Sequence, residues 1–513
     1  MQLFSKELEM KRRNPLKPYP ITLAMLFLIA LTPLSLHAQP EIEWSHLYGV
    51  DETVRHYCWN VAKTPDNHIL MVGRAQNFPE DILYRLSTFV LKTDINGEEI
   101  WSRAYREGLN DETAYCILPS SDNEYIIGGF VESNIDEHDV ERQFIYSLAT
   151  CIDEDGGVIW RKQYQLEQCS KIYSLVEAND GGYYITGMVY SVESGRDGYL
   201  LRTNSEGDSL WSRYFGEGGN EFFNKVILLD DGNLVLIGAT AYSFGTGRSS
   251  FYIVKVNAMG EEIWSRVIET ESSETTINAI QTSDGGFAVV GWTGLSPRYP
   301  RILKINENGE VEWMHIYGDD QHHIQTFHSI LETEDQGFVA IGYQHSPSVE
   351  TGYLVRTDRN GNALWSQTYQ LGDLSSTCTG INHSEDNGYL ISGFARFERG
   401  VFDRFWLFKT DPDPVGVPIL VNPAIPDQNI LSPCYPNPFN AITNISFDMA
   451  GKGHVQLGIF DMTGRKVSDL IDTDMESGQY NFSWDAAGLA SGTYQCRMRV
   501  GEQVITQKLI FTK

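Results

Sequence analysis

Short apolar runs and polar turns alternate along most of this chain. The stretch from Tyr353 to Trp365 is representative: one run of alternating residues, a tight turn, and a second run that ends in Trp. Alternation with a period of two predicts β-strands, and the Asp, Asn and Gly residues between the runs predict turns. An Asp or Asn is followed three positions later by Gly and seven positions later by Trp in six copies: Asp94/Gly97/Trp101, Asp153/Gly156/Trp160, Asn204/Gly207/Trp211, Asn257/Gly260/Trp264, Asn306/Gly309/Trp313 and Asp358/Gly361/Trp365.

These copies form a long-period repeat, because successive Trp residues lie between 49 and 59 positions apart. A period near 50 predicts a propeller or an array. A second marker, an Asp followed seven positions later by Gly, opens an apolar strand in each unit, so that each unit holds four short strands. This marker occurs at Asp66/Gly73, Asp122/Gly129, Asp180/Gly187, Asp231/Gly238, Asp284/Gly291, Asp335/Gly342 and Asp386/Gly393.

The two ends of the repeat predict a closed ring. The last unit has a third strand, Phe405 to Asp411, but no fourth strand after it. Glu41 to Tyr48 looks like a fourth strand with no unit before it. Closure by this N-terminal strand would leave no unpaired sheet edge between the first and last units. We therefore predict an all-β chain with a seven-bladed β-propeller of four-stranded blades over residues 41–411.

The Asp-x-x-Gly-x-x-x-Trp pattern resembles the tryptophan-docking motif of quinoprotein-type propellers, in which each Trp packs between neighbouring blades. A large ring beside a turn suits such burial. Quinoprotein dehydrogenases also have a vicinal cysteine pair and resemble eight-bladed rings, whereas this chain has no Cys-Cys. We therefore predict no quinone or other cofactor. The resemblance implies a structural interblade role for Trp44, Trp101, Trp160, Trp211, Trp264, Trp313 and Trp365.

Composition and charge limit the classes of partner that this chain is expected to bind. The chain has 513 residues, 42% of them hydrophobic and 21% charged, and a formal net charge of −29. An acidic surface repels phosphate backbones, so we predict no nucleic-acid partner. The seven cysteines form no CxxC pair. An odd count leaves at least one thiol without a partner in the chain. Cys58 and Cys116 are a candidate pair, and buried free thiols are the alternative.

The N-terminus has the pattern of an export signal. A basic stretch through Lys17 precedes the apolar run Ile21 to Leu36. That run is short for a membrane span and fits a signal peptide over residues 1–38, cleaved near Ala38. The mature chain is then expected to have no transmembrane segment. An uncleaved anchor is the alternative.

Blade topology predicts which face carries a ligand site. The loops after the second and fourth strands of a blade share one face, and in this chain they vary in length. Variable loops on a rigid scaffold usually carry binding. We therefore expect a ligand site on this face or at the channel mouth there. The variable loops are Arg74–Arg85, Phe130–Gln143, Ala239–Ser250, Tyr317–Phe327 and Phe394–Arg404.

Three groups of residues suggest a specific ligand site, and for each group an ordinary structural or surface role is the favoured interpretation. Asp319, Asp320, His322, His323 and His328 could hold a metal but fit an exposed polar loop, so no metal site is predicted. Acidic residues could ring the channel mouth around a cation, or be solvated or strand-capping carboxylates. Aromatic residues in the loops could stack on sugars, or be singly exposed. The last two sets are Asp51, Glu52, Asp111, Glu112, Glu221 and Glu274, and Tyr242, Phe244, Tyr299 and Phe397.

No catalytic residue is predicted. The chain has no Gly-x-Ser-x-Gly, no His-Glu-x-x-His and no phosphate-binding Gly loop. Carboxylates are too abundant for a glycosidase pair to be picked out or excluded.

The last hundred residues differ from the repeat. Residues 412–432 are Pro-rich and predict an extended linker. Residues 433–513 alternate with a period of two, and six or seven antiparallel strands in this length predict a small β-sandwich.

Five motifs in this block resemble, in order, the C-terminal sorting domain of the type IX secretion system. They are Tyr435-Pro-Asn-Pro-Phe-Asn440, Phe460-Asp-Met-Thr-Gly-Arg-Lys-Val467, Trp484-Asp485, Ser491-Gly-Thr-Tyr494 and Lys508-Leu-Ile-Phe-Thr-Lys513. The form is the one related to the Ig-like domain of flagellar hook-capping proteins, and an ordinary Ig-like module is the alternative. The residues that carry the resemblance are Pro436, Asn437, Pro438, Asp461, Gly464, Arg465, Trp484, Gly492, Tyr494 and Lys508.

The resemblance implies that the type IX secretion machinery is a partner, and that the chain is secreted or displayed on the outer-membrane exterior of a Gram-negative-type bacterium. Together these features predict an exported, non-catalytic propeller that recognises an extracellular carbohydrate or protein. A propeller-based glycan-degrading enzyme and a structural surface-layer component are the alternatives.

Overall fold

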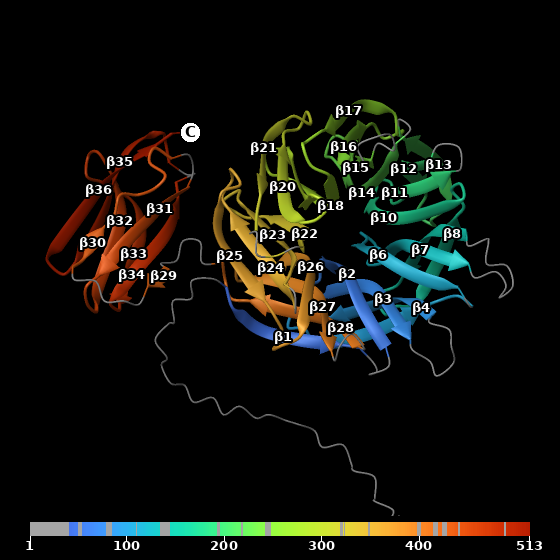
Figure 1. Ribbon diagram of the computed structural model, residues 1–513, viewed down its shortest axis with the longest axis horizontal. Coiled ribbons are helices and arrows are strands. Elements are labelled where there is room, and N and C mark those ends of the chain that lie inside the picture. The colour runs from blue at the N-terminus through green and yellow to red at the C-terminus, as the bar shows by residue number, and fades with distance from the viewer. Residues whose placement is uncertain are drawn as a thin grey trace, which may run out of the picture. The chain divides into compact units, whose positions relative to one another are not determined.

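Figure 1 shows the computed structural model of the chain. It describes residues 40–49, 54–77, 85–108, 110–133, 144–191, 195–216, 219–241, 248–318, 322, 324–346, 349–397, 402–413, 419–422, 428–439, 442–486 and 489–512. Every regular element in these ranges is a β-strand. In the same ranges there is no helix with the length and apolarity that a membrane span needs. The predicted signal peptide, residues 1–38, lies outside them.

Strands β1 to β28 form seven hydrogen-bonded groups of four within the described residues, which we call quartets. Six are consecutive along the chain, and β1 completes the seventh. The quartets are β2 (Val54–Lys63), β3 (Ile69–Asn77), β4 (Arg85–Thr93), β5 (Glu99–Tyr105); β6 (Asp111–Pro119), β7 (Tyr125–Ser133), β8 (Phe144–Ile152), β9 (Val158–Tyr164); β10 (Cys169–Glu177), β11 (Tyr183–Ser191), β12 (Gly195–Thr203), β13 (Ser209–Phe215); β14 (Asn220–Leu228), β15 (Leu234–Ala241), β16 (Ser249–Val256), β17 (Glu262–Ile268); β18 (Glu274–Gln281), β19 (Phe287–Thr293), β20 (Tyr299–Ile305), β21 (Val311–Ile316); β22 (Ile324–Glu332), β23 (Phe338–His345), β24 (Glu350–Thr357), β25 (Ala363–Tyr369); and β26 (Ser375–His383), β27 (Tyr389–Phe397), β28 (Phe402–Thr410), β1 (Ile42–Tyr48).

The quartets form a ring around an axis, with the first strand of each quartet innermost (Figure 1). Each inner strand contacts the next one around the ring, and β26 contacts β2. Three neighbouring quartets are also joined into one twelve-stranded sheet, because single parallel pairs link β8 to β10 and β12 to β14. The all-β propeller predicted from the repeat is confirmed, and a smaller β domain follows it.

A β-bulge interrupts every inner strand at the same place. In β14, for example, Phe223 pairs with Gly238 and Lys225 pairs with Ile237, so that Asn224 has no partner in the ladder. A bulge bends the strand and pushes its backbone toward the neighbouring strand. A Cβ atom on Gly238 would lie only 1.8 Å from the Phe222 carbonyl oxygen, so only Gly fits there.

The second sequence marker therefore has a physical cause that holds in all seven quartets. Each marker Gly faces a backbone carbonyl of the bulged inner strand, which would lie 1.8 to 2.0 Å from an added Cβ. The pairs are Gly73 and Tyr57, Gly129 and Thr113, Gly187 and Lys171, Gly238 and Phe222, Gly291 and Thr275, Gly342 and Thr326, and Gly393 and Thr377.

Neighbouring quartets pack through the Trp residue of the outer strand. The Trp160 ring of one quartet lies against Gly207 of the next, where a Cβ would be 2.7 Å from the ring. The φ angle of Gly207 is +76°, which suits a turn that only Gly adopts without strain. Trp101 instead donates its indole N–H to the Glu154 carbonyl, at 2.9 Å. The other Trp–Gly contacts of this kind are Trp44 with Gly97, Trp211 with Gly260, Trp264 with Gly309, and Trp313 with Gly361.

A Tyr four positions after the Trp adds a hydrogen bond to the same turn. Its hydroxyl donates to the carbonyl oxygen of the Gly in the next quartet, as Tyr164 does to Gly207 at 2.8 Å. Phe215 and Ile268 occupy the equivalent position in two quartets and have no hydroxyl. The remaining bonds are Tyr48 to Gly97, Tyr105 to Gly156 and Tyr317 to Gly361, and Tyr369 donates to the Pro40 carbonyl at the closing seam.

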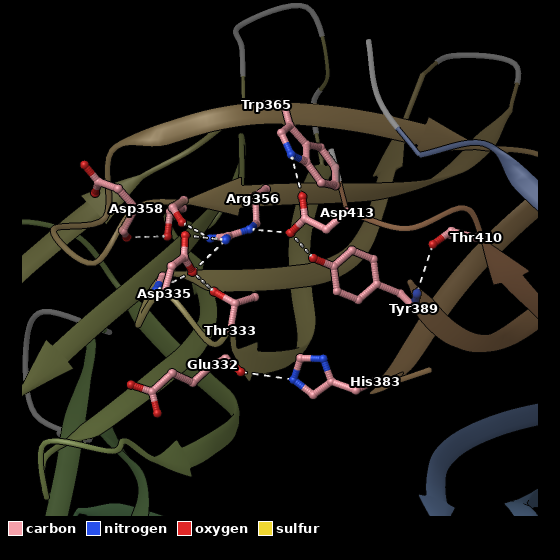
Figure 2. A network of polar contacts seen from close by, with 12 residues as sticks. Glu332, Thr333, Asp335, Arg356, Asp358, Trp365, His383, Tyr389, Thr410 and Asp413 are labelled. Atoms are coloured by element: carbon pink, nitrogen blue, oxygen red, sulfur yellow. Dashed lines mark hydrogen bonds and ion pairs between the residues drawn. The ribbon is translucent and has the colours of Figure 1, made fainter. Parts of the chain in front are cut away.

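The last quartet has no Gly turn for Trp365 to contact. A buried polar network takes the place of this turn where β1 closes the ring. Asp413 follows β28, is almost fully buried, and accepts hydrogen bonds from Arg356 Nε at 2.7 Å and the Tyr389 hydroxyl at 2.5 Å (Figure 2). Trp365 Nε1 lies 3.4 Å from its other carboxylate oxygen. Arg356 also pairs with Asp335 at 2.7 Å, so its buried charge has two carboxylate partners. This network joins the last two quartets beside the strand β1 that closes the ring.

The C-terminal domain consists of two four-stranded antiparallel sheets. Buried and exposed residues alternate along its strands, as expected where two sheets share a core. The first sheet has the order β29-β34-β31-β30 and the second β33-β32-β35-β36. The strands are β29 (Ile419–Asn422), β30 (Ile430–Leu431), β31 (Ile442–Met449), β32 (Gly453–Asp461), β33 (Lys466–Met475), β34 (Gly478–Asp485), β35 (Gly492–Val500) and β36 (Gln503–Phe511).

Two of these strands come from the range in which the sequence predicts only a linker. β29 pairs with β34, and β30 pairs with β31. The Pro residues that suggested a spacer flank these short strands without interrupting their ladders. All seven cysteines are free thiols in the structure, and six of them are buried.

The bulge contact generates a stability prediction. Gly238→Ala should lower the free energy of unfolding of the propeller by about 3 kcal/mol or more, because backbone must move to admit the Cβ. Gly232→Ala is the control: its φ is +81° but a Cβ there meets nothing within 4 Å. It should cost about 1–2 kcal/mol from the left-handed backbone alone. Urea unfolding of the mature chain measures both, and equal losses would contradict the bulge explanation.

Candidate ligand-binding site

The inner strands surround a cavity on the propeller axis with a volume of about 310 Å³. We call it the central cavity. Its lining includes one bulge residue from every quartet, because a bulge turns the extra side chain out of the ladder. These seven residues, the bulge ring, are Trp59, Tyr115, Tyr173, Asn224, Ile277, His328 and Thr379. The rest of the lining is Asn60, Cys116, Ile117, Leu118, Ser174, Leu175, Lys225 and Asn278.

The bulge ring is aromatic on one side. Tyr115 is the middle member, with ring centroids 6.3 Å from Trp59 and 5.4 Å from Tyr173. Phe130 lies 5.8 Å from Tyr115, and Phe394 lies 6.3 Å from Trp59. Consecutive quartets therefore present a continuous aromatic arc to the axis.

The other side of the ring is mostly polar, with Asn224, His328 and Thr379 beside the apolar Ile277. Asn224, Asn278 and His328 line it together with the Lys225 side chain. Burial lowers the pKa of Lys225 below its usual range, and lowers the pKa of His328 from 6.5 to about 4. His328 is thus a neutral imidazole at neutral pH.

Two buried polar atoms of the bulge ring have no hydrogen-bond partner among the described residues. They are Trp59 Nε1, a donor, and Asn224 Oδ1, an acceptor. A buried polar atom without a partner costs free energy. A ligand or solvent in the cavity that offers both an acceptor and a donor would remove that cost.

This ring was not predicted from the sequence, although a positional signal for it exists. Each bulge residue lies fourteen positions before the Gly of the second marker, as Trp59 does before Gly73. The seven residues share no residue type, so no repeated letter shows the position. The predicted site among the variable loops falls largely on residues 78–84, 134–143, 242–247, 319–321 and 398–401, which lie outside the described residues.

The four loop aromatics are not brought together in the described part of the chain. Tyr242 and Phe244 lie outside it. Phe397 is covered by Arg404, whose guanidinium carbon is 5.5 Å from the ring centre. Tyr299 begins β20 and pairs with Thr293 in the ladder.

The acidic residues near the fourth-to-first strand connections are hydrogen-bonded within the protein where they are described. Glu112 and Glu274 are buried and accept hydrogen bonds from Arg161 at 2.6 Å and Arg301 at 2.8 Å. Glu221 is also buried and accepts from a Thr hydroxyl, and burial raises its pKa. Asp111 accepts a backbone N–H at 2.9 Å. Asp51 and Glu52 lie outside the described residues.

Of the candidate metal residues, the structure describes His322 and His328. His328 lines the central cavity, whereas Asp319, Asp320 and His323 lie outside the described residues. In the described ranges no cluster of three or more His, Cys, Asp or Glu residues is placed to hold a metal ion.

A wider hollow of about 590 Å³ lies between the turns that connect first and second strands. Its polar groups already bind one another. Glu332 accepts two hydrogen bonds from Ser283, and Glu385 accepts one from Asn67 at 2.8 Å. Two of its glutamates are therefore already hydrogen-bonded within the protein.

In the C-terminal domain, the motif residues hold the ends of strands. The Asn437 amide donates to the Lys508 carbonyl at 2.7 Å and accepts from the Ile510 N–H at 2.8 Å, so the Pro-Asn-Pro segment is fixed to β36. Asp461 caps its turn by accepting from Arg465, and Gly464 has a φ of +85°.

The remaining motif residues lie in the same domain. Trp484 is buried and its ring centre lies 5.8 Å from that of Phe439. Tyr494 donates to the Ala490 carbonyl at 2.6 Å. Pro436 accepts from Thr443 at 2.8 Å, Gly492 begins β35, and Pro438 follows Asn437 in the fixed segment.

Residues 433–512 match the family described as the secretion system C-terminal sorting domain. The match supports export of this chain by the type IX secretion machinery, to the cell surface or the extracellular space of bacteria of the Bacteroidetes type. It covers only the C-terminal domain. A search of curated proteins gives no match.

Solved structures match this chain at low sequence identity. The WD40 domain of Pan2 from Neurospora crassa is 8% identical, with a TM-score of 0.42, over 68% of this chain and 88% of that one. An ulvan lyase of polysaccharide lyase family PL25 is 8% identical, with a TM-score of 0.47, over 72% and 94%. Sqt1 from Chaetomium thermophilum is 11% identical, with a TM-score of 0.40, over 70% and 88%.

Burial of His328 generates a pH prediction. Because its pKa is lower in the folded chain than in the unfolded chain, the unfolded state binds more protons below pH 6.5. The neutral His328 side chain therefore contributes its full share of the unfolding free energy above pH 6.5. This contribution, up to about 3 kcal/mol, is lost as the pH falls toward about 4.

His328→Asn should make the unfolding free energy depend less on pH between 6.5 and 4. Part of the pH dependence should remain in this variant, because burial also lowers the pKa of His56 to about 4. Urea unfolding at several pH values measures both effects, and an unchanged profile in His328→Asn would contradict the prediction.

Proposed function

We propose that this chain is an exported, non-catalytic recognition protein that binds an extracellular carbohydrate or protein ligand in the central cavity. The observation that carries the proposal is the bulge ring, where aromatic faces on one side oppose amide and imidazole groups on the other. Ligand sites combine apolar and aromatic walls with a few placed polar groups, in cavities of about 300–1,000 Å³. The central cavity lies at the small end of that range.

A carbohydrate fits this arrangement better than a protein surface. The C–H face of a sugar ring packs on aromatic faces, and its hydroxyls both donate and accept, as Trp59 Nε1 and Asn224 Oδ1 require. A flat protein surface would not reach side chains that lie on the axis between inner strands.

The architecture that we propose for this function has seven blades and an Ig-like sorting domain. The seven quartets support the blade number, and the two four-stranded sheets support an Ig-like β-sandwich. We propose a cleaved signal peptide over residues 1–38, a propeller over 41–411, a connecting segment over 412–432, and the sorting domain over 433–513. The Trp contacts across quartets support a docking role for the seven Trp residues.

Binding in the central cavity is tested with a glycan array. The mature chain should bind a subset of glycans and release no product from them. Tyr115→Ala should weaken binding by about tenfold or more, because it interrupts the aromatic arc at its middle. Tyr214→Ala is the matched control, since Tyr214 is 45% exposed on the outer strand β13.

Three outcomes would contradict the recognition proposal. Released sugars would indicate a glycan-degrading enzyme instead. Equal effects of the two Tyr variants would place binding outside the central cavity. Absence of any binding would favour a structural surface component.

Delivery is tested by deleting residues 436–513 in the native host. The shortened chain should remain inside the outer membrane, because the sorting motifs are gone. The matched control attaches residues 419–513, which include β29 and β30 of the same domain, to an unrelated periplasmic protein, which should then reach the cell exterior. Normal surface delivery of the shortened chain would contradict the sorting role.

A further inference from the structure

The charge of the central cavity is opposite to that of the chain. The sequence has 68 acidic and 39 basic residues, yet none of the residues that line the cavity is Asp or Glu. Lys225 is the one Lys or Arg in the lining, and His328 is its one His. A random sample of this surface would be acidic, so the composition of the lining needs a specific explanation.

Lys225 differs from the other buried cations of the propeller. Arg301, Lys304 and Arg356 are all largely buried, and each forms an ion pair with a carboxylate. Lys225 forms no ion pair with a described residue. The ionisable neighbour nearest to its charge is Cys116, a buried thiol, and Tyr115, Tyr173 and His328 are the other titratable groups of the lining.

An unpaired cation in a partly desolvated site is costly, and a bound anion would offset that cost. Burial lowers the pKa of Lys225 because the charged form is unfavourable in this desolvated site. The cavity therefore has a charge that its own residues do not balance.

Two further cations flank the aromatic arc. The Arg74 guanidinium lies over the rings of Tyr57 and Trp59, at 4.7 and 5.8 Å from their centres, and the Lys171 ammonium lies 4.4 Å from the centre of Phe130. Neither forms an ion pair with a described residue. The buried Arg74 Nε has no hydrogen-bond partner in the described part of the chain.

The geometry points to an acidic saccharide, one that carries a carboxylate or a sulfate on its sugar ring, as the ligand of the central cavity. Lys225 would bind the acidic group, the aromatic arc would stack on the sugar ring, and Arg74 and Lys171 would attract the ligand from the rim. This inference rests on the proposed recognition function, because it assumes that the cavity binds a saccharide.

Charge repulsion by the rest of the chain does not prevent such binding. Surface charges are screened over about 8–10 Å at ordinary salt, whereas the acidic group of a short saccharide in the cavity would contact Lys225 directly. A long phosphate backbone would instead lie along the acidic exterior, so the arrangement favours a short acidic saccharide over a nucleic acid.

The test compares an acidic saccharide with its neutral form on the full mature chain. Trigalacturonic acid and its methyl ester share the same sugar rings, and the ester replaces each carboxylate with an uncharged methyl ester; a sulfated galactan oligosaccharide tests the second anion. Isothermal titration calorimetry should show at least about tenfold tighter binding of trigalacturonic acid, or of the sulfated probe, than of the neutral match. Desulfated oligosaccharide is the neutral match of the sulfated probe.

Lys225→Met keeps the length of the side chain and removes its charge. It should abolish the preference for the acidic form and change affinity for the neutral form by less than about twofold. Lys255→Met, on strand β16 of the same quartet and outside the cavity lining, is the control and should keep the preference. If Lys225→Met does not fold, Arg74→Gln at the rim serves as the second variant, with a smaller loss of preference expected.

The outcomes separate this inference from the proposed function. Equal binding of acidic and neutral forms, or binding of neutral glycans alone, would overturn the acidic ligand and leave recognition standing. A preference that survives Lys225→Met and Arg74→Gln would overturn the assigned residues. If no saccharide binds, neither these probes nor any glycan of the array, both proposals fail.

Discussion

The close contact between each inner-strand bulge and a Gly of the second strand is the constraint on which the propeller depends. The bulge brings a carbonyl so near the second strand that no Cβ fits opposite it, as at Gly238 beside Phe222. The same bulge frees one side chain per quartet from the ladder and turns it toward the axis. One backbone feature therefore both fixes a Gly in every repeat and builds the lining of the central cavity.

Packing between quartets makes that lining rigid. The Trp of the outer strand, joined in most quartets by a Tyr, contacts the Gly turn of the next quartet, and the Asp413 network takes over this role where the last quartet has no such turn. Because every quartet is tied to the next, the bulge ring holds its side chains in a fixed circle. The residues at these seven positions are then free to differ, and they divide into an aromatic and a polar arc.

The sequence predicted those parts of the fold that need one residue type. Gly207 requires a positive φ and Trp160 fills the space beside it, so their spacing recurs and reveals the propeller. The bulge ring could not be predicted from residue identity, because Trp59 and Thr379 occupy equivalent positions and only the position is constrained. Asp413 was also missed, since it acts once in the chain, and β29 was hidden by flanking prolines.

The central claim is that the axis of the propeller, within the bulge ring, binds the ligand. A crystal structure of the mature chain with its best-binding saccharide tests this claim most directly. This crystal structure should show a sugar ring stacked on Trp59, Tyr115 or Tyr173, with polar contacts to Asn224 or Lys225. A saccharide bound on the outer strands or outer loops, with the central cavity unchanged, would contradict it.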